Sequence, residues 1–160
     1  METYVTVQGT TKAEIYEEII PQIASLLEGE SDLVANLANI AAVLKMSFPY
    51  VSWVGFYIAK GDELVLGPFQ GKPACVRIAI GKGVCGSAAE RKETIIGSNV
   101  HEFPGHIFCD PDSKSEIVVP IVRNGKILAV LDLDSNQLSM FDQVDNICLS
   151  RITKLLVPYF

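Results

Sequence analysis

The fold is decided by the segment EIVVPIVRNGKILAVLDLD, residues 116–134. Its two β-branched, apolar runs flank residues 123–126, where Asn-Gly favours a tight turn, so the pattern predicts an antiparallel hairpin. The second run ends with Asp132 and Asp134, which are two positions apart. Because side chains alternate along a strand, both aspartates point to one face and the neighbouring leucines point to the other.

The register of this hairpin decides where Glu116 lies. A two-residue Asn-Gly turn pairs Glu116 with Leu133 and separates it from the aspartates. A three-residue loop over residues 123–125, with Gly125 in the left-handed position of a bulge, places Glu116 opposite Asp132. We expect the three-residue loop and a cluster of three carboxylates. A two-residue turn without a compensating bulge would contradict the cluster, and a solvated polar strand face is the alternative interpretation of the aspartates.

Other segments show strand or helix patterns. Strands are expected in VSWVGFYIA (51–59), ELVLGPF (63–69), ACVRIAI (74–80) and TIIGS (94–98). Helices are expected in TTKAEIYEEIIPQIASLL (10–27), after Ser31 up to Phe48-Pro49, within GKGVCGSAAERK (81–92) and in DQVDNICLSRITKLL (142–156). This order predicts an α+β fold with a largely antiparallel five- or six-stranded sheet and helices from both chain ends.

Three local signals concern the N-terminal helices. Thr11 and Glu14 have the spacing of a capping box, which predicts the start of the first helix. Pro21 lies inside the same pattern and is expected to kink or interrupt that helix. Ser31 is the predicted cap of the second helix.

The bulk composition limits the classes of protein. With 160 residues, the chain is expected to form one domain over residues 1–160. A net charge of -6 argues against a nucleic-acid groove and against binding to an anionic membrane. The sequence shows neither a membrane span nor a signal peptide, so we expect a cytoplasmic protein with reduced cysteines.

Cysteines are the main candidates for chemistry. Residues 99–114 form a long irregular segment, which is more typical of a functional loop than of a plain connection, and it carries Cys109. Cys75 and Cys85 also lie next to loops or Gly-rich turns, whereas Cys148 lies in an apolar helix pattern and is expected to be a structural thiol. Paired thiols that cycle through a disulfide fit this distribution, and incidental exposure is the alternative for each.

The histidines and two aromatic residues are further candidates for metal or ligand binding. Zinc could use the cysteines with His101 or His106, but no two cysteines have the C-x2-4-C spacing of structural zinc motifs, so no metal is expected. Trp53 and Tyr57 share one strand face and are either core residues or the wall of a ligand site.

These residues together resemble the free methionine-(R)-sulfoxide reductases, which are single-domain members of the GAF fold. The resemblance spans residues 50–142 and rests on VSWVGFYI, LGPFQGKPACVRIAIGKGVCGSAA, FPGHIFCD, SEIVVPI and LAVLDLDS. It implies that Cys109 is the catalytic cysteine and that Cys75 and Cys85 are the two cysteines able to resolve its oxidised form. The resemblance favours Cys75 as the direct resolving cysteine, while spacing does not choose between them. Phe108 departs from the small residue usual before the catalytic cysteine.

The same resemblance assigns the substrate site and the partners. It implies that Glu116, Asp132 and Asp134 are the acidic residues of the active site and that Trp53 lines the substrate's methyl group; Tyr57, on the same strand face, joins the expected substrate site. The implied reaction is thiol-dependent reduction of free L-methionine-(R)-sulfoxide through a sulfenic acid and an intramolecular disulfide, which a thioredoxin-like partner reduces without any cofactor.

Two other functions and a homodimeric assembly are also compatible with the sequence. The chain could be a GAF module that senses a small ligand without turnover, or a peroxide-responsive thiol sensor. An amphipathic N-terminal helix beside a sheet edge is also compatible with a homodimer.

Overall fold

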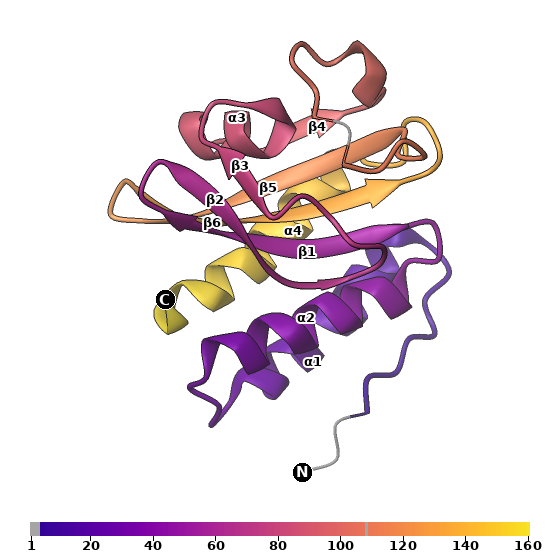
Figure 1. The fold of residues 1–160 in the computed structure, drawn as a ribbon. Helices are drawn as coiled ribbons and strands as arrows, with labels where there is room; N and C mark the ends of the chain where they lie inside the picture. Colours follow the sequence, from indigo (N-terminus) through magenta and orange to yellow (C-terminus); the bar gives the residue numbers. More distant parts are fainter. Residues whose placement is uncertain (1–3, 108) are drawn as a thin grey trace.

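The computed structural model describes residues 4–107 and 109–160, and in this part six strands form one antiparallel sheet (Figure 1). The strand order is β3-β2-β1-β6-β5-β4, so β1 and β6 lie at the centre of the sheet, and β5, the other strand of the β5–β6 hairpin, lies between β6 and the edge strand β4. The strands are β1 (Trp53–Lys60), β2 (Glu63–Gln70), β3 (Arg77–Ala79), β4 (Ile95–Gly97), β5 (Ser115–Arg123) and β6 (Lys126–Ser135). The predicted α+β fold is confirmed, with the larger of the two expected strand numbers.

Helices cover both faces of this sheet. The helices α1 (Lys12–Leu27), α2 (Leu33–Ser47) and α4 (Gln143–Leu156) pack on one face and form the larger apolar core (Figure 1). The short helix α3 (Gly83–Arg91) covers the other face, over a smaller apolar cluster that includes Trp53 and Tyr57. Two 3-10 turns, η1 (Val100–Glu102) and η2 (Val157–Tyr159), complete the described elements. No helix of residues 4–107 and 109–160 has both the length and the apolar character needed to cross a membrane.

The helix ends show where local signals succeed and fail. Thr11 caps α1, and Glu14 completes the predicted capping box. The expected interruption at Pro21 is wrong, because α1 continues through it: Pro21 is exposed, and the opposite apolar side of the helix is buried in the core. The predicted cap Ser31 is also wrong, since Asp32 caps α2 and its carboxylate accepts a hydrogen bond from the N–H of Ala35 at 2.9 Å.

The hairpin between β5 and β6 turns differently from the prediction. Arg123 pairs with Lys126 across a two-residue Asn-Gly turn in which Asn124 and Gly125 both have positive φ, of 51° and 74°. The expected three-residue loop is therefore wrong, because Asn and Gly tolerate the conformation that the tighter turn requires.

A bulge just beyond the turn compensates for it. Val122 pairs with Ile127 and Ile121 pairs with Ala129, so β6 has one residue more than β5 at this point. The bulge changes the parity of the pairing, as an extra residue in one strand must. Glu116 consequently lies opposite Asp134, so the expected pairing with Asp132 is wrong, although Glu116 still shares the strand face of both aspartates.

The predicted third strand is shorter than expected. Only Arg77–Ala79 pair with β2, and Cys75 lies in the preceding loop instead of in the strand. That loop is held by side chains of β1 and by a disulfide, so its backbone follows those contacts instead of the sheet.

The face of the sheet beneath α3 depends on a missing side chain at Gly55. Gly55 lies opposite Asp132 on β6 and between Trp53 and Tyr57 on β1. A Cβ atom at Gly55 would lie 2.6 Å from Cη2 of Trp53 and would collide with Cβ of Phe69. The small residue thus allows the indole ring to lie along the sheet.

We expect Gly55→Ala to lower the free energy of unfolding by roughly 1–3 kcal/mol, because the added methyl group overpacks this face. The protein contains one tryptophan, so its fluorescence reports directly on the displaced ring. Gly97→Ala is the matched control, since its Cβ would approach no heavy atom closer than 3.7 Å. Equal stability and equal emission for the two variants would contradict the role given to Gly55.

Candidate active site

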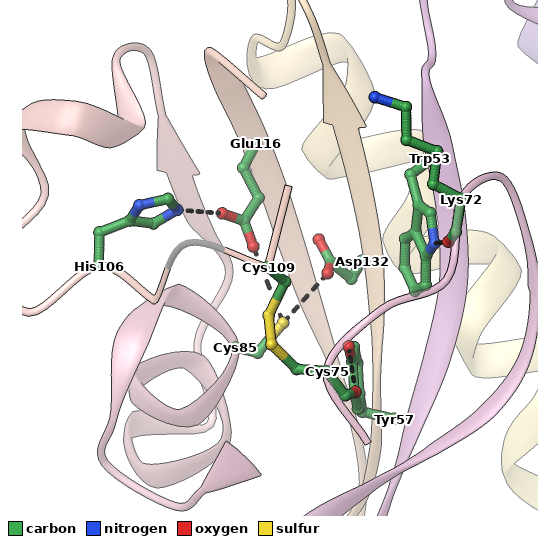
Figure 2. Close-up of a disulfide and its surroundings, with 9 residues drawn as sticks. All are labelled: Trp53, Tyr57, Lys72, Cys75, Cys85, His106, Cys109, Glu116 and Asp132. Carbon is green, nitrogen blue, oxygen red and sulfur yellow. Dashed lines mark hydrogen bonds and ion pairs between the residues drawn. A yellow bond between two sulfur atoms is a disulfide. The ribbon is translucent and has the colours of Figure 1, made fainter. Parts of the chain in front are cut away.

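A pocket opens between the sheet, α3 and the two loops that carry Cys75 and Cys109 (Figure 2). Its lining includes seven residues singled out in the sequence: Trp53, Tyr57, Cys85, Cys109, Glu116, Asp132 and Asp134. These residues come from β1, α3, β5, β6 and the loop before β5, so only the tertiary fold brings them together.

A disulfide joins Cys75 and Cys109 across the mouth of this pocket (Figure 2). Their Cα atoms are 5.5 Å apart, although 34 positions separate the two residues in the sequence. An ion pair makes a second connection between the same loops, because the ammonium group of Lys72 lies 2.8 Å from Asp112 Oδ2 and 3.4 Å from Asp110 Oδ1. The two loops therefore meet through one covalent bond and one exposed ionic contact.

Trp53 and Tyr57 attach the Cys75 loop to the sheet. The indole Nε1 of Trp53 donates a hydrogen bond to the carbonyl of Lys72 at 3.0 Å, and the hydroxyl of Tyr57 donates one to the carbonyl of Cys75 at 2.9 Å. The two rings stack with their centroids 6.0 Å apart, and Phe69 also stacks on Trp53, with centroids 5.4 Å apart. Both residues thus line the pocket and also position the loop that carries Cys75.

The three carboxylates gather on the strand face that points into the pocket. Glu116 and Asp132 are 6% and 5% exposed, and Asp134 is half-buried beside them. A solvated polar strand face, the alternative interpretation, is therefore wrong. The thiol of Cys85 donates to Asp132 Oδ2 at 3.2 Å and lies 3.8 Å from Glu116 Oε1.

Burial controls the protonation of this cluster. Burial raises the pKa of Asp132 to about 6, against the opposing effect of the hydrogen bond from Cys85. Burial raises the pKa of Glu116 well above its ordinary value, and the negative charges of Asp132 and Asp134 raise it further. The pKa of Asp134 is raised for the same reasons, first by burial and then by the negative charge of Asp132. Burial therefore favours the protonated form of Glu116, which can share its proton with Asp132.

Cys85 shares the same environment. Burial, followed by the charges of Asp132 and Glu116, raises the pKa of its thiol well above the ordinary value. The side chain is therefore a neutral thiol at physiological pH, and its hydrogen stays available to the aspartate. Cys148, in contrast, is buried in the core on the other side of the sheet, as the sequence predicted.

Sequence reasoning missed the polar residues that support the cluster. The hydroxyl of Ser113 donates to Asp134 Oδ1 at 3.0 Å. His106, considered before only as a zinc ligand, places Nε2 at 3.8 Å from Glu116 Oε2, and burial lowers the pKa of its imidazole. Their position in the Cys109 loop was the one available signal. Phe108, the departure noted in the sequence, lies outside the described residues.

Comparison with known proteins identifies close relatives. The family model described as GAF domain matches residues 28–155. The chain is 51% identical over 147 residues to "GAF domain-containing protein A" of Dictyostelium discoideum, covering 91% of this chain and 92% of that protein. It is 44% identical over 153 residues to free methionine-R-sulfoxide reductase of Saccharomyces cerevisiae, covering 91% of this chain and 85% of the yeast protein.

A solved structure gives the same result. The X-ray structure of free methionine-R-sulfoxide reductase from Neisseria meningitidis, in complex with its substrate, superposes with a TM-score of 0.96. The two sequences are 45% identical, and the match covers 99% of this chain and 96% of the other. The resemblance found on the sequence motifs is therefore confirmed over nearly the whole chain.

Because the pKa of Asp132 is raised in the folded protein, the free energy of unfolding should depend on pH. Between the ordinary aspartate pKa and about 6, the folded protein binds more protons than the unfolded chain, so stability falls as the pH rises through this window. Asp132→Asn removes the free-energy cost of burying this carboxylate in its ionised form. We expect it to raise the free energy of unfolding by roughly 1–3 kcal/mol at pH 7.5 and to change it little at pH 4.

Denaturant unfolding at both pH values measures this difference, and Asp142→Asn is the matched control. Against the effect of burial, hydrogen bonds from Lys12 and from the N–H of Val144 lower the pKa of Asp142, so its replacement should destabilise the protein at pH 7.5. A loss of stability at pH 7.5 in both variants would contradict the assignment of a strained Asp132.

Proposed function

The chain belongs to the GAF domain family and, within it, to the free methionine-R-sulfoxide reductases, which are oxidoreductases, and we propose that it reduces free L-methionine-(R)-sulfoxide to L-methionine. The observation that carries the proposal is the Cys75–Cys109 disulfide at the mouth of a pocket lined by Trp53 and three carboxyl groups. Such a pocket combines a redox-active pair with a source of protons. Residues 1–160 would act as a single GAF domain.

The charges of the pocket suit a free amino acid. An ionised Asp132, with Asp134 beside it, can hold the ammonium group of the substrate, and the indole ring of Trp53 can contact its methyl group. A peptide-bound sulfoxide lacks that ammonium group, and this difference supports restriction to the free amino acid. Negative charge beside Cys109 opposes thiolate formation, so the thiolate would form when the substrate's positive charge arrives.

The proposed chemistry begins at Cys109 and Glu116. The thiolate of Cys109 attacks the sulfoxide sulfur while protonated Glu116 donates its proton to the sulfoxide oxygen. The oxygen is transferred to the cysteine, so methionine leaves and Cys109 becomes a sulfenic acid. Glu116 supports this role because burial, and then the negative charge of Asp132, raises its pKa well above the ordinary value and favours the protonated form.

Resolution of the sulfenic acid falls to Cys75. The thiol of Cys75 attacks the sulfur of the Cys109 sulfenic acid, forming the disulfide and releasing water. Cys85 is buried and its thiol donates to Asp132, so we propose that it helps to hold the carboxylates and does not resolve the intermediate.

An external dithiol would complete the cycle. A thioredoxin-like protein would reduce the disulfide by thiol–disulfide exchange, as a cytoplasmic location would allow. Cys75 and Cys109 are only half-buried, and the adjacent Val76 is 62% exposed, which supports access by a protein thiol. The complete reaction consumes one sulfoxide and two thiols and yields methionine, water and a disulfide.

Methionine release tests the reaction. Wild-type protein with dithiothreitol should release methionine from free L-methionine-(R)-sulfoxide, and should act poorly on the (S) epimer and on a peptide-bound sulfoxide. Cys109→Ser should reduce release to background while retaining the folded state, whereas Cys148→Ser should behave as the wild type. No release from folded, reduced wild type would contradict the proposal and would favour a ligand-sensing module instead.

The resolving cysteine needs a separate comparison. Cys75→Ser should lose turnover supported by thioredoxin and should accumulate a Cys109 sulfenic acid, which a dimedone adduct detects by mass spectrometry. Cys85→Ser should keep thioredoxin-supported turnover and form the Cys75–Cys109 disulfide after one cycle. If the two variants exchanged these behaviours, Cys85 would be the resolving cysteine.

A further inference from the structure

Three side chains inside the pocket have the spacing of metal ligands. The Sγ atom of Cys85 and one carboxylate oxygen each of Glu116 and Asp132 all lie within 4.8 Å of one another. Two ligands of a tetrahedral zinc ion, at about 2.3 Å for sulfur and about 2.0 Å for oxygen, are separated by roughly 3.5 Å. The observed distances from Sγ to the two carboxylates, 3.2 and 3.8 Å, lie on either side of that value.

An unpaired oxygen points to a missing positive partner. Asp132 is only 5% exposed, and no N–H or hydroxyl group of the described residues donates a hydrogen bond to its buried Oδ1; the carboxyl group of Glu116, when protonated, is the neighbour that hydrogen-bonds to Asp132. Leaving a buried carboxylate oxygen without a partner is costly. Over residues 4–107 and 109–160, none of the ion pairs made by lysine or arginine involves Glu116 or Asp132.

The chemistry of the donors selects the class of ion. We propose that Cys85, Glu116 and Asp132 form a binding site for one thiophilic divalent cation of the zinc type. A thiolate sulfur disfavours magnesium and calcium, which prefer oxygen ligands, and mixed sulfur and oxygen donors suit zinc. His106 supplies a neighbouring nitrogen, with Nε2 at 3.8 Å from Glu116 Oε2, and it or a water molecule completes a four-coordinate site.

Binding requires only proton release from the protein. The thiol of Cys85 and the carboxyl of Glu116 each lose a proton as the cation enters, and no oxidation or reduction takes place. Sequence spacing gave no sign of this site, because its ligands come from α3, β5 and β6 and lie 16 to 47 positions apart. The proposal does not rest on the proposed function, since binding is measured without turnover.

The test uses the disulfide form of the protein, in which Cys75 and Cys109 cannot ligate a metal. Cobalt(II) is the probe, because a cobalt–thiolate bond gives a charge-transfer band in the near ultraviolet that zinc then displaces. Wild-type protein should bind one equivalent of cobalt with this band. Cys85→Ala should lose the band, and Cys148→Ala, which removes the other free thiol, should keep it.

A second variant separates ligation from a folding defect. Asp132→Asn keeps the side-chain shape and should weaken cobalt binding about tenfold or more, the scale on which even outer-shell changes act. Circular dichroism verifies that each variant is folded. Absence of a stoichiometric band in the wild type, or a band that disappears with Cys148 and persists without Cys85, would overturn the proposal. Either result would leave methionine release unaffected, so the two proposals fail independently.

Discussion

Glu116 and Asp132 are buried on the same face of the sheet without a lysine or arginine partner among the described residues, and the pocket depends on this arrangement. Two carboxylates so placed cannot both ionise without a large desolvation cost. A proton, the ammonium group of a substrate or a metal cation can each relieve that cost. The proposed proton donation, the proposed recognition of a free amino acid and the proposed cation site are therefore three consequences of one electrostatic constraint.

The sheet maintains this constraint through geometry that no single strand specifies. The bulge between Ile121 and Val122 decides that Glu116 shares a face with the aspartates. Gly55 leaves space on the neighbouring strand for the ring of Trp53, which in turn holds the loop before β3. Each feature positions one part of the site. The bulge sets the face on which Glu116 lies, and Gly55 acts through Trp53 on the loop that carries Cys75. Function at this site thus depends on register and close packing in β1, β5 and β6.

The sequence could predict the features that depend on local interactions. The capping box of Thr11 and Glu14, most of the strand patterns and the buried Cys148 follow from spacing and hydrophobicity and agree with the structure, whereas the third strand is shorter than its pattern predicts. The bulge could not be predicted from the sequence, because contacts between two strands decide which residues of β5 and β6 lie opposite each other. The two helix errors have a related cause: at Pro21 core packing outweighs local preference, and Ser31 and Asp32 are equally good caps by residue type.

The site itself divides into two groups of residues with different requirements. Cys75 and Cys109 lie half-buried on loops, where the proposed thioredoxin-like reductant would have access to them. Cys85 and the carboxylates lie on regular elements, buried, where proton affinities are shifted by the surroundings. Thiol–disulfide exchange needs cysteines that another thiol can reach. Proton transfer needs acidic groups that are held in fixed positions and shielded from water. Local sequence marks the loops as candidates for chemistry, but only the assembled sheet reveals that the polar residues beneath them form one buried, interacting cluster.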